Sequence, residues 1–188
     1  MGKIYEDVTT NNNESISNDI VDLFNSVTTN FSGRDDILHR ESEINRIYGI
    51  MDKMEYRSVL LVGDKGIGKT SIIEGYINKL KEEFRKDVVF TVDYNDVCEK
   101  VNTPSDFGKI IDAIISISCD VENVIINMNN IGHMLNHSVY GNGGYSFLNK
   151  IVNAVKNSDM RIIATCTTDE FDKIDSDFHY LLDHFTVM

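Results

Sequence analysis

The 188-residue sequence has little of what marks several specialised classes of protein. It contains no tryptophan, one proline and three cysteines, Cys98, Cys119 and Cys166, which are far apart and form no CxxC pair. This scattered, odd set of thiols argues against a disulfide framework or a zinc site, and it favours a reducing, cytoplasmic location. No apolar run approaches the roughly 20 residues of a membrane-spanning helix, and the N-terminus lacks the pattern of a secretory signal.

Positive charge is also scarce. Lysine and arginine number 18 against 30 aspartates and glutamates, which gives a formal net charge of −12. The closest approach to a basic patch, at residues 79–86, is interleaved with acidic residues. Because such a surface repels nucleic acids and anionic membranes, the sequence predicts that neither is a partner.

Past residue 40, short continuous apolar runs alternate with stretches whose apolar residues recur at helical spacing. The short runs predict strands that are buried on both faces. Repeated alternation of this kind predicts an α/β fold, a parallel central sheet with helices on both faces, and a ligand site beyond the carboxyl ends of the strands. The predicted strands are 58–62, 88–92, 121–128, 161–167 and 185–188, and the predicted helices are 41–54, 70–84, one from Pro104, one through 148–155 and one capped by Thr167 and Glu170.

The N-terminal segment differs from the rest in composition. Residues 1–30 are mostly polar, so we expect a partly disordered arm, followed by one domain over residues 31–188. Apolar residues at helical spacing between Ile16 and Val27 predict one short helix that docks within this arm.

The loop after the first predicted strand reads GDKGIGKT over residues 63–70, a full match to the phosphate-binding pattern GxxxxGK[ST], also known as Walker A. Glycines let successive N–H groups turn toward phosphate oxygens, and the following helix adds its positive end. Lys69 supplies charge to the β- and γ-phosphates, and Thr70 supplies a hydroxyl ligand for Mg²⁺. The alternative is a glycine-rich turn with a solvated lysine. We predict that ATP or ADP with Mg²⁺ is bound by Gly63, Asp64, Lys65, Gly66, Ile67, Gly68, Lys69, Thr70 and Ser71.

Several segments together resemble the first ATPase domain of the Clp protein unfoldases ClpB, ClpA and ClpC, which are AAA+ P-loop NTPases. They are DDILHRE at 35–41, SVLLVGDKGIGKTSIIEG at 58–75 and TDEF at 168–171. The resemblance runs from about Asp35 to Met188 and implies the AAA+ large subdomain, without the family's helical lid subdomain. It also implies that Ile37 and Leu38 pack against the adenine ring.

Two departures from the family pattern concern hydrolysis. The resemblance puts Asn129 and Asn130 where the family has the Walker B Asp and Glu, which hold Mg²⁺ through water and polarise the attacking water. An amide cannot act as a base, and loss of a general base costs about 10²- to 10⁴-fold in rate. Asp183 and His184 stand where the family has arginine fingers, which are worth about 10³- to 10⁵-fold. Thr167 remains a candidate sensor of the γ-phosphate.

The binding loop is thus intact while the hydrolysis residues are replaced. This predicts a Clp-like, ATP- or ADP-binding domain with impaired or absent hydrolysis, at most a weak ATPase, with no firmly assigned catalytic residue. We expect it to act as a regulatory or assembly module whose partner is another AAA+ protein or a second copy. One alternative is an active ATPase or unfoldase component completed by a partner, or by Asp93 or Asp120 near the metal. Another is an interaction scaffold with a vestigial loop.

Overall fold

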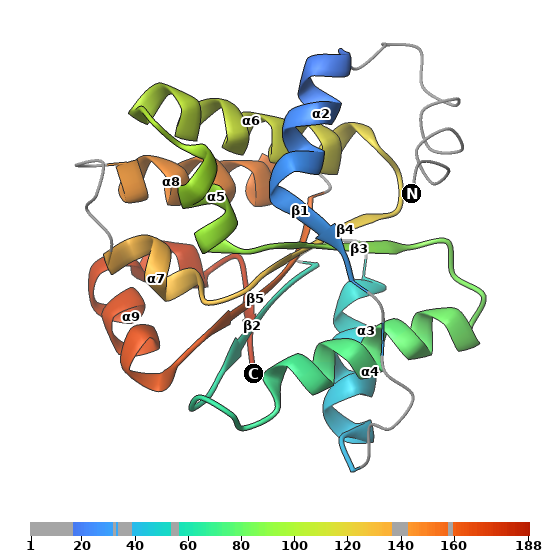
Figure 1. The fold of residues 1–188 in the computed structure, drawn as a ribbon. Coiled ribbons are helices and arrows are strands. Elements are labelled where there is room, and N and C mark those ends of the chain that lie inside the picture. The colour runs from blue at the N-terminus through green and yellow to red at the C-terminus, as the bar shows by residue number, and fades with distance from the viewer. Residues whose placement is uncertain (1–16, 32, 34–38, 54–56, 137–142, 158–159) are drawn as a thin grey trace.

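The computed structural model of the chain describes residues 17–31, 33, 39–53, 57–136, 143–157 and 160–188. Its centre is a six-stranded sheet in the order β1-β3-β4-β5-β2-β6, with helices on both faces (Figure 1). All neighbouring strands pair in parallel except β1, which runs antiparallel to β3. The predicted fold class is therefore confirmed. The strands are β1 Thr28–Asn30, β2 Ser58–Val62, β3 Val88–Val92, β4 Val124–Met128, β5 Arg161–Cys166 and β6 Thr186–Val187.

The helices follow the predicted alternation, with two additions. The strands predicted at 58–62 and 88–92 coincide with β2 and β3, whereas α5 and α7 are helices of 7 and 6 residues that were not predicted. Both helices span fewer than two turns, so their apolar residues show little periodicity. The helices are α2 Asn18–Val27, α3 Glu41–Met51, α4 Lys69–Glu82, α5 Tyr94–Lys100, α6 Pro104–Asp120, α7 Ile131–Asn136, α8 Gly143–Asn157 and α9 Thr168–Leu182.

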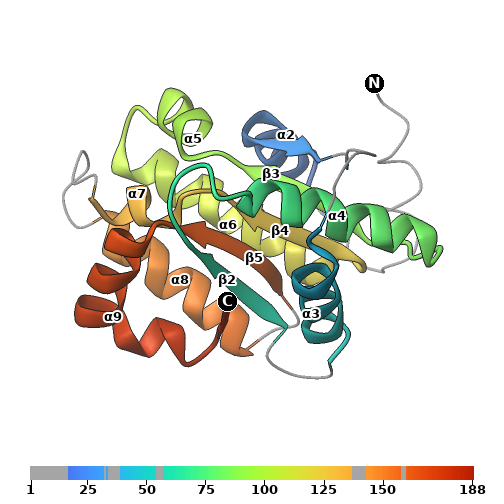
Figure 2. The same ribbon diagram turned by 90° about the horizontal axis from the view of Figure 1, so that it is seen from below.

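The sheet divides the core into two layers, because side chains alternate between its faces along each strand. Helices α3 and α4 cover one face, and α2, α6, α8 and α9 cover the other (Figures 1 and 2). In β4, Ile126 and Met128 belong to the α6 layer, while Ile125 belongs to the α4 layer. By the same alternation, Asn127 faces α4. A polar residue therefore lies in the layer next to the helix that begins at the phosphate loop.

Residues 18–30 pack onto the sheet domain. Phe24 and Val27 of α2 are fully buried, and the rings of Phe24 and Phe90 lie 5.1 Å apart, edge to face. The short helix predicted in this region is present, whereas β1 is a polar three-residue strand that the sequence did not reveal. Residues 1–16 lie outside the described part of the chain, and the division of the chain at residue 30 stays a prediction.

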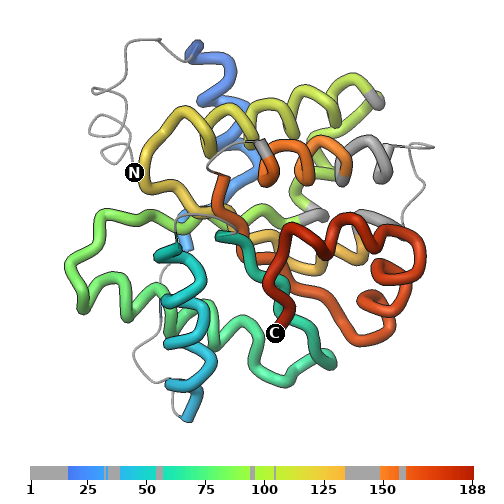
Figure 3. Tube along the Cα trace, turned by 180° about the vertical axis from the view of Figure 1, so that it is seen from behind, coloured from blue at the N-terminus to red at the C-terminus, as the bar shows by residue number. Residues whose placement is uncertain are grey.

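The carboxyl ends of β2, β4 and β5 meet at one edge of the sheet, with β5 between the other two. The phosphate loop follows β2 at this edge. The last residue of the sequence, Met188, exchanges backbone hydrogen bonds with Leu60 and Val62 of β2, so the end of the chain lies beside the same strand (Figure 3). No helix among the described residues combines the length and apolar character needed to cross a bilayer.

Candidate functional site

The loop between β2 and α4 adopts a conformation that depends on glycine. Gly66 and Gly68 have φ angles of 85° and 100°, and Gly68 is the N-cap residue of α4. Residues with a Cβ are disfavoured in this left-handed region. The Ile67 N–H donates to the Asp64 carbonyl oxygen at 3.3 Å and closes the turn. The spacing of glycines in the sequence thus corresponds to the positions where the backbone requires them.

This loop offers unused hydrogen-bond donors. The backbone N–H groups of Gly66, Gly68 and Lys69 donate to no other described residue. The first N–H groups of a helix have no partner within it, and the helix dipole makes its N-terminus electropositive. Helix α4 has 14 residues, so the loop has the features of an anion site.

Lys69 adds a positive charge at the same place. Its Nζ donates to the carbonyl oxygens of Gly63 at 2.5 Å and Asp64 at 3.1 Å, and it makes no ion pair within the described chain. A phosphate oxygen is a stronger, charged acceptor than a carbonyl. The loop conformation, its free N–H groups and this ammonium together fit a polyphosphate.

The start of α9 is bound to the loop. The Gly63 N–H donates to the carbonyl of Cys166 at 3.3 Å, and the Thr168 hydroxyl donates to Asp64 Oδ1 at 3.1 Å. The Thr167 hydroxyl accepts from the Glu170 N–H at 3.3 Å, while Glu170 Oε2 accepts from the Thr167 N–H at 2.8 Å. This confirms the predicted capping box. The hydroxyl of Thr167 therefore serves as a helix cap, and its role as a phosphate sensor stays a prediction.

Cys166 is a core residue. Its side chain is fully buried, and this burial raises the pKa of its thiol to about 12, with the negative charge of Glu170 adding to the effect. A thiol that stays protonated at neutral pH is a poor nucleophile. Cys166 therefore acts as a small packing residue of the core.

Two amides follow β4 at the same edge. Asn130 has a φ of 54°, a region that asparagine tolerates, and its N–H donates to Thr165 Oγ1 of β5 at 2.9 Å. The half-buried Asn129 accepts a hydrogen bond on its Oδ1 from Asn127 Nδ2 at 3.3 Å. No carboxylate stands at either position, as the sequence shows, so these residues do not provide the acidic Mg²⁺ site that the Clp family has there. The exposed Thr70 is the predicted metal ligand.

Asn127 is a buried polar residue that the sequence reasoning missed. It is fully buried, and its Nδ2 also donates to Thr91 Oγ1 at 3.0 Å, whereas its Oδ1 has no hydrogen-bond partner among the described residues. An unsatisfied buried acceptor costs about 1–3 kcal/mol. The available signal was an asparagine in the middle of an otherwise apolar strand.

A comparison with protein families assigns the chain. Residues 59–187 match the family described as ATPase family associated with various cellular activities (AAA). The chain belongs to the AAA family. Membership implies nucleotide binding, which in these ATPases typically involves Mg²⁺.

Within the AAA family, the curated relatives that match are Clp proteins. The chain is 26% identical over 142 residues to chaperone protein ClpB of Malacoplasma penetrans, which covers 72% of this chain and 20% of the relative. It is 27% identical over 148 residues to ClpB of Aquifex aeolicus, which covers 74% of this chain and 14% of the relative. It is 22% identical to ClpE, the ATP-binding subunit of the Clp protease of Bacillus subtilis, over 76% of this chain and 21% of the relative. The chain thus spans a fifth or less of the first ClpB relatives.

Solved structures of Hsp104 share the fold. The Saccharomyces cerevisiae Hsp104–ADP complex superposes with a TM-score of 0.74 at 17% identity and covers 88% of this chain and 24% of Hsp104. A closed-state reconstruction of Hsp104 with ATPγS and casein gives a TM-score of 0.73 at 14% identity, with 88% of this chain and 30% of Hsp104 covered. These similarities support a Clp-type AAA+ large subdomain.

Arg40 reaches the loop of this AAA domain from the segment before α3. Its Nη2 donates to the carbonyl of Ile67 at 2.8 Å, and its Nη1 pairs with Glu43 at 3.0 Å. This residue lies in the 35–41 segment that carries the family resemblance, but its contact with the loop could not be read from the sequence. The predicted adenine contacts Ile37 and Leu38 lie outside the described residues.

Three acidic or basic candidates lie away from this loop. Asp183 and His184 lie shortly before β6, which runs parallel to β2, so they lie at the opposite edge of the sheet. Asp120 ends α6 just before β4 begins and lies at that edge as well. The suggestion that Asp120 stands in near the metal is therefore wrong, and Asp183 and His184 cannot reach the loop of their own chain.

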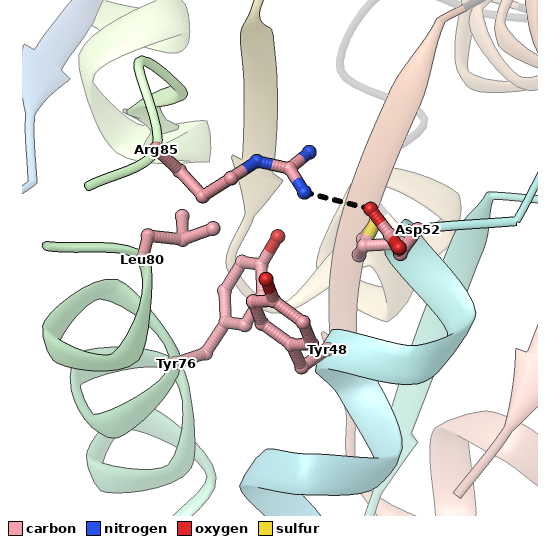
Figure 4. A pocket seen from close by; sticks show the side chains of 6 residues that line it. Tyr48, Asp52, Tyr76, Leu80 and Arg85 are labelled. Atoms are coloured by element: carbon pink, nitrogen blue, oxygen red, sulfur yellow. Dashed lines mark hydrogen bonds and ion pairs between the residues drawn. The ribbon is translucent and has the colours of Figure 1, made fainter. Parts of the chain in front are cut away.

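The opposite edge also holds a small hollow between α3 and α4, seen in Figure 4. It is lined by Tyr48, Met51, Asp52, Tyr76, Leu80 and Arg85, and its walls leave no room for a ligand. Arg85 Nη1 pairs with Asp52 Oδ1 at 2.7 Å across it. Burial raises the pKa of the Tyr76 hydroxyl, so this group remains protonated. The ion pair across the hollow links the ends of α3 and α4, and the hollow is not a second binding site.

Proposed function

We propose that this AAA domain binds ATP or ADP, hydrolyses it slowly or not at all, and acts as a regulatory or assembly module of a Clp-like system. The observation that supports this proposal is the contrast between two neighbouring loops. The loop at residues 63–70 has its glycine conformations, unused N–H groups and Lys69, whereas Asn129 and Asn130 stand where the resemblance puts the Walker B carboxylates.

Nucleotide binding rests on the chain's own donors. The N–H groups of Gly66, Gly68 and Lys69 lie next to the positive end of α4, where a polyphosphate would accept hydrogen bonds from them. The Lys69 ammonium would exchange its carbonyl partners for phosphate oxygens. The similarity to Hsp104, which has been solved with ADP and with ATPγS, supports the same class of ligand.

Weak hydrolysis follows from the chemistry of the replaced groups. An amide cannot accept a proton from an attacking water at neutral pH, and loss of a general base typically costs about 10²- to 10⁴-fold in rate. Asp183 and His184 replace arginine fingers, whose positive charge is worth about 10³- to 10⁵-fold. These losses need not multiply, because groups that act together are not additive.

The partner in this proposal is another AAA+ protein or a second copy of the chain. Asp183 and His184 lie at the edge opposite the loop, so groups at these positions would act only on a neighbouring molecule. Cys98, Cys119 and Cys166 form no disulfide in the described part of the chain, which suits a reducing, cytoplasmic compartment. The net charge of −12 argues against nucleic acids and anionic membranes as partners.

Equilibrium binding and phosphate release test the two halves of the proposal. We expect ATP or ADP at about a hundredfold excess over Kd to stabilise the domain by about 2.7 kcal/mol in a thermal or chemical melt. Lys69→Ala should remove this effect, with Lys65→Ala, an exposed lysine in the same loop, as a milder comparison. Absence of binding by the unaltered protein would favour an interaction scaffold.

The second candidate is an ATPase completed by a partner in trans. Asp183 and His184 lie away from the loop of their own chain, so in this alternative the groups for hydrolysis come from another chain. Phosphate release above about 0.1 per second that Lys69→Ala abolishes would support this alternative, and it would contradict impaired hydrolysis.

A further inference from the structure

The hydrogen bonds beneath the Walker B position fix the orientation of Asn129. Asn127 Nδ2 donates both to Thr91 Oγ1 at 3.0 Å and to Asn129 Oδ1 at 3.3 Å. The oxygen of Asn129 is therefore turned toward the buried layer. Its Nδ2 makes no hydrogen bond to any described residue, and the residue is only half buried.

The two amides are coupled. Turning over Asn127 alone would put its oxygen against the oxygen of Asn129 at the 3.3 Å now spanned by a hydrogen bond, which is repulsive. The present arrangement instead leaves Asn127 Oδ1 buried and unpartnered. Asn127 thus spends both of its N–H groups on Thr91 and Asn129, and Asn129 presents a donor at the edge of the sheet.

This edge is the one that carries the phosphate loop. Asn129 follows β4, the loop follows β2, and β5 is the single strand between them, so the two strands are about 10 Å apart. Asn130 is fastened to β5 through Thr165, whose neighbour in the pairing is Leu61 of β2. A nucleotide bound to the loop would extend its terminal phosphate into the space between these strand ends.

We infer that Asn129 is a hydrogen-bond donor to the terminal phosphate, held in place by Asn127, and that nucleotide binding here does not depend on Mg²⁺. This inference rests on the proposed nucleotide binding. A Walker B carboxylate pair would repel a bare polyphosphate, and the cation would offset that repulsion. With two neutral amides at these positions, the repulsion is absent, and an N–H donor replaces the acceptor that a metal-bound water would need.

Calorimetric titration of the full chain with ATP and with ADP, in excess Mg²⁺ and in excess EDTA, tests this inference. We expect the Kd of the unaltered protein for either nucleotide to change by about threefold or less between the two conditions. Asn129→Asp introduces a carboxylate that faces the phosphates, so the variant should bind ATP about tenfold or more weakly in EDTA than in Mg²⁺. Asn153→Asp on the exposed side of α8 is the matched control, and it should leave the ratio unchanged.

A variant that reverses the hydrogen bond between residues 127 and 129 tests whether Asn127 positions Asn129. In Asn127→Asp, an acceptor replaces the donor, so Asn129 should turn its NH₂ group inward and its oxygen outward. ATP binding should then become stronger in Mg²⁺ than in EDTA. Because the new carboxylate would itself repel the phosphates, the neutral Asn127→Leu variant separates this repulsion from loss of positioning. If Asn127→Asp fails to fold, Asn127→Leu removes the constraint, and it should weaken ATP binding about threefold while ADP binding changes less.

The outcomes separate the two proposals. No binding of ATP or ADP in either condition would overturn the proposed function itself. Binding by the unaltered protein that is lost in EDTA would leave nucleotide binding intact and overturn the inference. A ratio that stays the same in Asn129→Asp would also overturn the assignment of Asn129 to the phosphate.

Discussion

The two edges of the central sheet use polar groups in opposite ways. At the edge away from the phosphate loop, Asp87 pairs with Arg161 and with Arg85, and Arg85 also pairs with Asp52. The Asp87 side chain is 1% exposed, so this charge is buried but has two partners. At the loop edge, N–H donors of Gly66, Gly68 and Lys69 find no acceptor in the described chain. The edge away from the loop, called the structural edge below, has charges that are paired, whereas the loop edge has donors that could bind a ligand.

The largest expected effect separates stability from binding at the structural edge. Asp87→Ala leaves the buried guanidinium of Arg161 without its partner, and breaking a buried pair from one side costs about 3–5 kcal/mol. Urea denaturation should show this loss, while the ATP affinity of the remaining folded protein stays unchanged. Asp52→Ala is the control, because this exposed carboxylate should contribute at most about 1 kcal/mol. A loss of ATP binding by folded Asp87→Ala protein would break the distinction between the edges.

The next effect concerns the backbone of the loop edge. Gly68→Ala places a Cβ on a residue with a φ of 100°, which costs about 1–2 kcal/mol, although the nearest atom, Arg40 Nη2, is at an ordinary 3.6 Å. The strain should reshape the loop, so ATP binding should weaken together with stability. Gly49→Ala in α3 is the matched control. It meets nothing within 4 Å and should stabilise the helix by about 0.5–1 kcal/mol, as urea denaturation would show.

The sequence predicts those parts of the fold and of the candidate site that depend on neighbouring residues. The run at β2, the glycines of the loop and the capping box of α9 are each specified by neighbouring residues, and the structure confirms the strand, the glycine conformations and the cap. A polar three-residue strand such as β1 carries no such pattern. Strand β1 forms because it directly follows α2, which packs on the sheet and places these residues beside β3.

The site residues that sequence reasoning missed depend on contacts between distant segments. Arg40 reaches Ile67 across 27 positions, and Asn127 reaches Thr91 across 36. Neither contact has a local pattern. The position of Asp183 and His184 likewise became clear only from the parallel pairing of β6 with β2, which places them away from the loop.

A smaller effect distinguishes capping from ligand contact at Thr167. Both Thr167 and Thr103 cap a helix with their hydroxyl groups, so replacement of either by alanine should cost about 1 kcal/mol of unfolding free energy. Only Thr167 lies beside the phosphate loop. Thr167→Ala should therefore also weaken ATP binding, whereas Thr103→Ala should not. Equal ATP affinities of the two variants would restrict Thr167 to its capping role.

The smallest effect is electrostatic and lies on the exposed side of α9, toward the structural edge. The hydrogen bond of His179 Nδ1 with Asp175 Oδ1, at 2.7 Å, raises the pKa of this histidine above its ordinary value, and the charges of Asp175 and Asp183 add to the shift. Because the folded-state pKa is the higher one, the pair stabilises the protein fully below the unfolded pKa, and this contribution is lost as the pH rises through the folded pKa. Both side chains are exposed, so solvent should screen the effect strongly. NMR titration should give His179 a lower pKa in Asp175→Asn than in the unaltered protein, with ATP binding unaffected, whereas an unchanged pKa would show that the ion pair does not persist in solution.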